Sequence, residues 1–322
     1  MSEIAVQTER RIDWRSIAQR YGIAVSFLLL CLALSLLSDR FLTVGNLTNI
    51  LRQSTINGII SVGMTIVILT RGIDLSVGSI LALSAVVTAD LLQGGMSIPA
   101  AIGIGVALGG ILGFVNGFLI TRFRIPPFIA TLGMMTFARG LALTYTQGRP
   151  VTGLPDGFRS LGAGYLGSIP MPIVIATLIF LVAYFALTRM KFGEYIYAIG
   201  NNEVAAHLSG IPVKRYVTAA YVILGALSAL AGQILIGRLN SAQPVAGLGF
   251  EFDAIAAVVV GGTSFEGGDG SLLGTLLGVL IIAVINNGLN LLDVPSFYQS
   301  VVKGVVIALA LLIHRAMRVS GQ

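Results

Sequence analysis

Charged residues, cysteine and histidine are all scarce in this chain. Only 11% of its 322 residues are charged and 55% are hydrophobic, whereas soluble domains are about a quarter charged. A soluble fold is therefore excluded. Cys31 is the single cysteine, which excludes an intramolecular disulfide or a cysteine metal site. The two histidines, His207 and His314, are too few and too far apart in sequence to indicate a bound metal.

Motifs for catalysis are also missing. None of the three lysines, Lys191, Lys214 and Lys303, is followed by Ser or Thr, so no GxxxxGK[ST] nucleotide loop exists, and no HExxH is present. We expect the chain not to be an enzyme and to bind no cofactor of its own. If ATP and Mg drive it, a partner subunit hydrolyses the nucleotide. Few apolar runs carry ionisable groups, which disfavours a proton-coupled pump.

Long apolar runs make up most of the sequence and predict an all-α polytopic membrane protein of about ten transmembrane helices, some of them broken. We expect one transmembrane domain over 21–314, a cytoplasmic segment at 1–20 and a cytoplasmic tail at 315–322. Most Lys and Arg residues lie in alternate loops, which places both termini in the cytoplasm by the positive-inside rule. The predicted spans are 21–38, 56–70, 76–93, 98–120, 127–147, 171–188, 216–236, 252–264, 271–288 and 298–314.

Glycine and proline have two separate uses. Glycine recurs every four residues at 105, 109, 113 and 117 and again at 270, 274 and 278, a spacing that lets helices pack closely. Residues 148–170 contain three prolines and six glycines, so they are expected to form an external loop, placed to receive a delivery protein.

Polar side chains interrupt two of the predicted spans. One set lies at four-residue spacing on one helical face, and a second set closes the ninth span. Both could line a translocation path by offering amides and hydroxyls to a neutral solute, or could instead bond to neighbouring helices or to water. The candidate path residues are Asn57, Ser61, Thr65, Asn286, Asn287 and Asn290.

Two glycine-rich breaks, at 70–78 and 261–270, separate pairs of apolar runs and suggest two related halves. Such breaks mark transport paths in some transporters, but tight turns between short helices are favoured here. We expect Arg71 and Asp74 to pair with each other, because an isolated charge at membrane depth is costly. The proposed turn residues are Arg71, Gly72, Asp74, Gly78, Gly262, Gly267 and Gly268.

The longest inner loop, 189–215, is predicted to contain a short helix that Asn caps and that Gly210 and Pro212 end. Val204 and Leu208 would form an apolar ridge on it, suited to a groove in another protein.

Five segments resemble the permease subunits of bacterial ATP-binding-cassette importers for ribose, xylose, arabinose and galactosides. They are GMTIVILTRGIDLSVGS (63–79), FIATLGMM (128–135), YAIGNNEVAAHLSGI (197–211), SAQPVAGLGFEFDAIAAVVVGGTSFEGGDGS (241–271) and NNGLNLL (286–292). The resemblance covers nearly the whole chain. Glu266 and Asp269 depart from it, because a neutral or basic turn is expected there.

The resemblance implies a permease of the cell inner membrane that imports a monosaccharide, ribose by overall similarity, by alternating access. The implied partners are a second permease copy, a periplasmic sugar-binding protein and a cytoplasmic ATPase with two fused nucleotide-binding halves. The implied coupling helix that docks on the ATPase includes Asn201, Asn202, Glu203, Ala205, Ala206, Ser209 and Gly210. An ATP-independent secondary transporter or channel for a small neutral solute is the alternative, but it would not need this segment.

Overall fold

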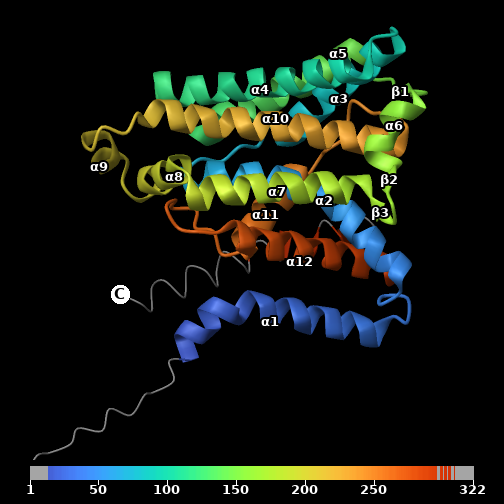
Figure 1. Ribbon diagram of the computed structural model, residues 1–322, viewed down its shortest axis with the longest axis horizontal. Coiled ribbons are helices and arrows are strands. Elements are labelled where there is room, and N and C mark those ends of the chain that lie inside the picture. Colours follow the sequence, from blue (N-terminus) through green and yellow to red (C-terminus); the bar gives the residue numbers. More distant parts are fainter. Residues whose placement is uncertain (1–13, 296–297, 300, 303, 306–307, 309–322) are drawn as a thin grey trace, which may run out of the picture.

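The computed structural model describes residues 14–295, 298–299, 301–302, 304–305 and 308 as a bundle of roughly parallel and antiparallel helices (Figure 1). The helices are α1 (Trp14–Leu37), α2 (Val44–Leu69), α3 (Val77–Gln93), α4 (Ile98–Phe123), α5 (Pro127–Thr146), α6 (Asp156–Ala163), α7 (Met171–Arg189), α8 (Lys191–Asn201), α9 (Glu203–Leu208), α10 (Val213–Leu239), α11 (Phe250–Val260) and α12 (Leu272–Leu291). The all-α prediction is confirmed.

The bundle has two distinct ends (Figure 1). At the end that we call the strand end, β1 (Val151–Thr152) pairs with β4 (Ser241–Ala242), and β2 (Tyr165–Leu166) pairs with β3 (Ile169–Pro170). Helices α8 and α9 lie at the opposite end, which we call the α9 end. As predicted, residues 148–170 contain no membrane span. They are more regular than an open loop, because they contain α6 and three of these short strands.

Five described helices, α4, α5, α7, α10 and α12, are long and apolar enough to cross a membrane, and α3 and residues 22–37 of α1 are shorter apolar helices. The predicted spans at 21–38, 76–93, 98–120, 127–147, 171–188, 216–236 and 271–288 match described helices closely. Helix α2 begins at Val44, after the cap residue Thr43. The prediction began only at residue 56 because the first half of this helix is polar. The predicted span 298–314 lies mostly outside the described residues.

The eighth predicted span, 252–264, is wrong as a complete crossing. Helix α11 has 11 residues and rises only about 16 Å, roughly half of the hydrocarbon core. The preceding segment enters the bundle from the strand end, and a Cβ on Gly78 would come 2.1 Å from the carbonyl oxygen of Gly247. Arg139 of α5 holds this segment by donating to the carbonyl oxygens of Pro244 (2.7 Å) and Ala246 (2.8 Å).

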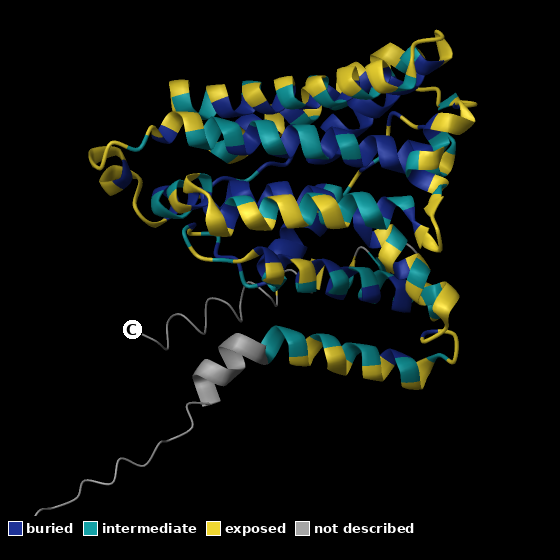
Figure 2. Cartoon of the chain, in the orientation of Figure 1, coloured by how far each residue is buried: buried dark blue, intermediate teal, exposed yellow. Residues whose placement is uncertain are grey.

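Helices α2, α3 and α10 form the centre of the bundle and have more buried residues than any other helix (Figure 2). Helix α10 packs along α4, where the predicted glycine seam is confirmed: a Cβ on Gly113 would lie 2.1 Å from the carbonyl oxygen of Tyr221. The second seam is confirmed as well, since a Cβ on Gly278 would lie 1.9 Å from the carbonyl oxygen of Ala257. Large apolar side chains on α1, α4, α5 and α7 point outward, as lipid contact requires.

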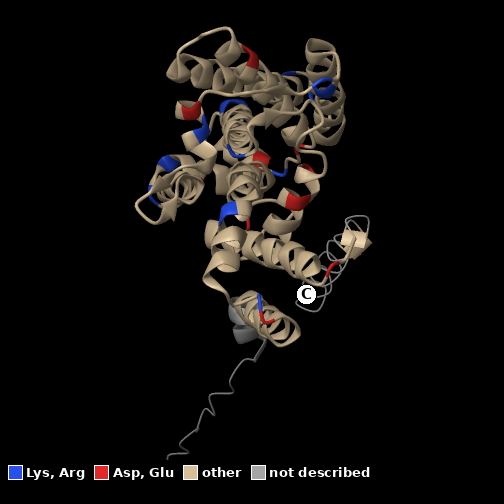
Figure 3. Ribbon diagram, turned by 90° about the vertical axis from the view of Figure 1, so that its right-hand side faces the viewer, with Lys and Arg blue, Asp and Glu red and all other residues tan. Residues whose placement is uncertain are grey.

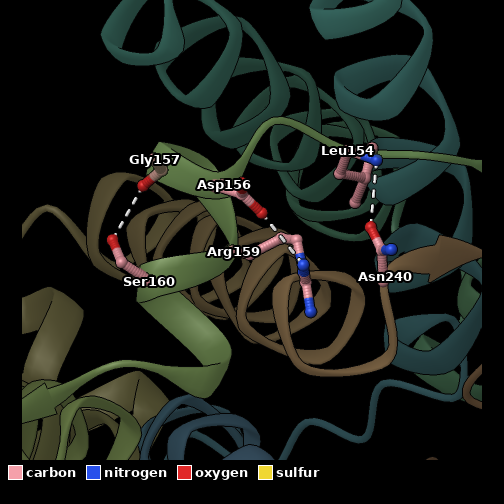
Figure 4. A network of polar contacts seen from close by, with 6 residues as sticks. All are labelled: Leu154, Asp156, Gly157, Arg159, Ser160 and Asn240. Atoms are coloured by element: carbon pink, nitrogen blue, oxygen red, sulfur yellow. Dashed lines mark hydrogen bonds and ion pairs between the residues drawn. The ribbon is translucent and has the colours of Figure 1, made fainter.

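Residues 151–170, which we call the cap, cover the strand end of the bundle and are held there by side-chain contacts (Figure 4). Asn240, which ends α10, accepts a hydrogen bond from the backbone N–H of Leu154 at 3.0 Å, and Arg159 pairs with Asp156 within α6 at 2.9 Å. Gly162 lets α6 approach α10, because a Cβ there would meet the backbone of Arg238 at 2.2 Å. The cap is thereby tied to the end of α10.

Candidate functional site: an amide-lined cavity and the α9 surface

A cavity of about 290 Å³ lies between α2, α10, α11 and α12. It is in the half of the bundle nearer the strand end, since its lining comes from the first half of α2 and the last turns of α10 and α12. Its volume is close to the lower end for small-molecule sites. Among its lining residues are Asn57, Asn286, Asn287 and Asn290, so the structure brings together four of the six candidate path residues.

Two of these four amides have internal partners that fix them. Asn287 and Asn46 of α2 form a reciprocal pair, with Nδ2 to Oδ1 distances of 3.0 and 2.8 Å. Asn290 accepts from Nε2 of Gln299 at 2.8 Å. The first contact joins the strand ends of α2 and α12, the second joins α12 to the segment that follows it, and both amides remain at the cavity wall.

The other two amides are only partly satisfied. Nδ2 of Asn57 donates to Asp253 at 3.2 Å, but the buried Oδ1 atoms of Asn57 and Asn286 have no hydrogen-bond partner in the described structure. A buried acceptor without a partner loses its hydration at a cost of about 1–3 kcal/mol. Two such oxygens on one cavity therefore favour occupancy by water or by a hydroxylated solute.

Ser61 and Thr65, the remaining path candidates, lie outside the cavity. Both are buried in the contact between α2 and α12, where Thr65 Oγ1 is 2.8 Å from Thr275 Oγ1 and donates to the carbonyl of Ser61 at 2.7 Å. The Ser61 hydroxyl has no described partner. This threonine contact lies on the α9 side of the cavity, where it ties α2 to α12.

The cavity also contains two charged residues that sequence reasoning missed, Arg238 and Asp253. Asp253 lies in the first turn of α11, where a carboxylate is stabilised by the helix dipole. A carboxylate at the start of an apolar run was a usable signal in the sequence. Lysine, arginine, aspartate and glutamate are otherwise few and scattered when the bundle is viewed from this end (Figure 3).

The expected pairing of Arg71 with Asp74 is wrong. Nε of Arg71 donates to the carbonyl oxygen of Gly200 at 2.7 Å, and its Nη2 donates to the carbonyl oxygen of Asn201 at 2.8 Å. Arg71 therefore satisfies the last carbonyls of α8, at the negative end of that helix dipole. It links the first break to the segment before α9.

Asp74 instead organises the start of α3. Its Oδ1 accepts from the backbone N–H of Ser76 at 2.7 Å and from the Ser76 hydroxyl, and its Oδ2 accepts from Nδ2 of Asn116 at 3.3 Å. All three residues are fully buried. Gly72 and Gly78 allow close approach here, because a Cβ on Gly72 would lie 2.5 Å from the Tyr221 hydroxyl oxygen.

The second break is a tight turn at the α9 end. Gly262, Gly267 and Gly268 have positive φ of 87°, 77° and 71°, a region that glycine adopts without a steric penalty. The N–H of Gly268 donates to the carbonyl oxygen of Leu69 at 3.0 Å, so the two breaks touch each other. The preference for turns over path agrees with this geometry.

Helix α9 extends beyond the bundle at this end (Figure 1). Asn202 caps it by accepting from the N–H of Ala205 at 3.0 Å, and Gly210 ends it with φ 83°. Val204 and Leu208 are 69% and 82% exposed, so the predicted apolar ridge is present.

Ala206 corrects the predicted coupling surface. It is 5% exposed and packs with Ile199 and Val213 inside the chain, so it cannot contact a partner. Asn201 belongs to the end of α8, and its side chain lies against Gly268. The exposed positions are Asn201, Asn202, Glu203, Val204, Ala205, His207, Leu208, Ser209 and Gly210.

Comparison with known proteins decides the family, because residues 46–311 match the permease component of the branched-chain amino acid transport system. The chain belongs to this permease family. It is 51% identical to the ribose import permease RbsC of Bacillus subtilis (strain 168), over 96% of this chain and 97% of the relative. It is 48% identical to RbsC of Escherichia coli (strain K12), over 90% and 91% of the two chains. No solved structure matches.

A third relative, the D-allose transport system permease AlsC of Escherichia coli (strain K12), is 43% identical over 87% of the permease described here and 86% of its own length. The resemblance to sugar importer permeases is thus confirmed. Together with the long apolar helices, it identifies the permease as a multi-pass membrane protein.

Proposed function

We propose that the permease is the membrane-spanning subunit of an ATP-driven importer for ribose, located in the bacterial inner membrane with both termini in the cytoplasm. The carrying observation is the amide-lined cavity, whose unpaired Oδ1 atoms of Asn57 and Asn286 suit the hydroxyl groups of a sugar. The ribose permeases at 51% and 48% identity support the choice of sugar.

The proposed partners are a periplasmic sugar-binding protein at the strand end, a second permease copy and a cytoplasmic ATPase with two fused nucleotide-binding halves at the α9 end. The exposed ridge of Val204 and Leu208 supports docking at the α9 end, because two large apolar side chains on an isolated surface helix gain from burial in a partner's groove. ATP and Mg would be bound by the ATPase.

We propose transport by alternating access, with the Thr65–Thr275 contact as the barrier on the α9 side of the cavity. When ATP binding draws the ATPase halves together, α9 would move with them. Its motion would reach α2 through Arg71, which bonds to the carbonyls that precede α9, and through Gly268, which bonds to Leu69. Separation of Thr65 from Thr275 would then open the cavity toward the α9 end.

Reconstitution tests this proposal. The permease, its ATPase and its binding protein are placed in proteoliposomes, and uptake of labelled ribose is measured with and without ATP. We expect uptake that requires both ATP and the binding protein. Leu208→Glu should abolish ATPase co-purification and uptake, since a charge replaces the apolar ridge, while the exposed strand-end variant Leu166→Glu should retain ATPase co-purification. Ribose uptake by the permease without ATP would support the alternative, a secondary transporter or channel.

A further inference from the structure

An apolar groove of about 520 Å³ lies between α4 and α10 on the outside of the bundle, toward the α9 end. Its wall includes Phe114, Phe118, Val222 and Ile223. The two phenylalanine rings stack at 5.9 Å and are 50% and 42% exposed. In a membrane protein such a surface lies against lipid tails.

Three cations line the same groove at its α9 end. Arg122 is in the last turn of α4, and Lys214 and Arg215 are in the first turn of α10. All three are exposed, none forms an ion pair within the described part of the chain, and no acidic residue lines the groove. The groove therefore combines a long apolar wall with a concentrated positive mouth.

The position of Lys214 and Arg215 adds a further requirement for an anion. A helix N-terminus carries partial positive charge and favours negative neighbours. Two cations in the first turn of α10 oppose that preference, and no acidic residue accompanies them there. A phosphate between them and Arg122 would relieve the repulsion among all three.

We propose that this groove binds one anionic phospholipid of the leaflet on the α9 side. Its phosphate lies at Arg122, Lys214 and Arg215, and an acyl chain follows Phe118 and Phe114 toward the bilayer centre. Basic pockets between transmembrane helices are recognised sites for anionic headgroups. This inference requires membrane embedding but not ribose transport.

The geometry disfavours other occupants. Phe114 lies two helical turns beyond Arg122, about 12 Å deeper along α4, a depth that a cytosolic protein such as the ATPase does not reach. A second copy of the chain would meet the groove through a two-fold axis and bring six cations together, because such an interface uses the same patch on both subunits. A lipid satisfies both halves of the groove at once.

Native mass spectrometry of the purified full-length permease in detergent tests the site. Palmitoyl-oleoyl phosphatidylglycerol, phosphatidylcholine with the same chains, and glycerol 3-phosphate are titrated separately. We expect one phosphatidylglycerol molecule to be retained in preference to phosphatidylcholine, and no retention of glycerol 3-phosphate. The variant Arg122→Gln/Lys214→Gln/Arg215→Gln should lower phosphatidylglycerol affinity by roughly fivefold for each cation removed.

Matched variants keep the test falsifiable. Arg124→Gln/Arg189→Gln/Lys191→Gln removes three exposed cations at the same end outside the groove and should preserve the lipid preference. Val222→Trp fills the groove and should weaken retention, whereas Leu181→Trp on the outer face of α7 should not. Equal retention of the two lipids by the wild type would overturn the site. Unchanged phosphatidylglycerol retention in the Arg122→Gln/Lys214→Gln/Arg215→Gln variant would overturn it as well, and if that variant also lost ATPase co-purification, the three cations would belong to the ATPase contact instead. Uptake is not the readout, so failure of ribose transport is a separate result.

Discussion

Single polar residues in this permease separate into those with internal partners and those without. Asn46, Asn287 and Asp74 are fully engaged inside the bundle, whereas Asn57 and Asn286 retain unpaired buried oxygens at the cavity. Because a helical bundle in lipid satisfies most of its own polar groups, two such oxygens on one cavity favour its occupancy by water or by a hydroxylated solute. The sequence indicated which asparagines matter, but not which of them pair, since pairing depends on how α2 meets α12.

Asp74 provides a test at the residue scale. Asp74→Leu leaves the buried N–H and hydroxyl of Ser76 without their acceptor, and a buried orphan costs about 1–3 kcal/mol, whereas the amide of Asn116 keeps its bond to the Ser76 hydroxyl oxygen at 3.0 Å. We expect a lower thermal unfolding temperature in detergent. The control Asp156→Leu breaks an exposed ion pair, which contributes little. Equal stability of the two variants would show that Asp74 does not anchor α3.

At the scale of elements, apolar runs were enough to predict most helices, because length and hydrophobicity alone define a span. The prediction failed where a non-helical segment and a short helix together replace a full transmembrane helix. Helix α11 has only 11 residues because it begins at Phe250, after a non-helical segment that Arg139 holds and that occupies the other half of the depth. The pairing expected between Arg71 and Asp74 failed because sequence proximity says nothing about the carbonyls of α8 that Arg71 reaches.

The α4–α10 seam yields a prediction with an internal control. Gly113→Ala places a methyl group 2.1 Å from the carbonyl oxygen of Tyr221 and must separate the helices, at an overpacking cost of about 1–3 kcal/mol. Gly103→Ala on the same helix meets nothing within 4 Å. Thermal unfolding should therefore show Gly113→Ala to be destabilised and Gly103→Ala to be at least as stable as the wild type. A harmless Gly113→Ala would contradict the seam.

For the whole molecule, the cavity and α9 lie at opposite ends, connected by α2, the two glycine breaks and α8. Arg71 and Gly268 make this connection through backbone carbonyls. The sequence predicted the asparagines, the two glycine breaks and the apolar ridge on α9. It also placed Ala206 on the surface, whereas the fold buries this residue. A helix of six residues is too short for its buried face to be read from periodicity.

The most direct test of the proposed path is Asn286→Leu, with Asn49→Leu as the exposed control on α2. Asn286 Oδ1 has no internal partner, so an apolar replacement should leave thermal stability unchanged or raise it. If the cavity receives ribose, losing that acceptor should reduce ATP-dependent ribose uptake in proteoliposomes by about three- to tenfold, while Asn49→Leu transports normally. Full uptake by a stable Asn286→Leu permease would contradict the assignment of this cavity to the sugar path.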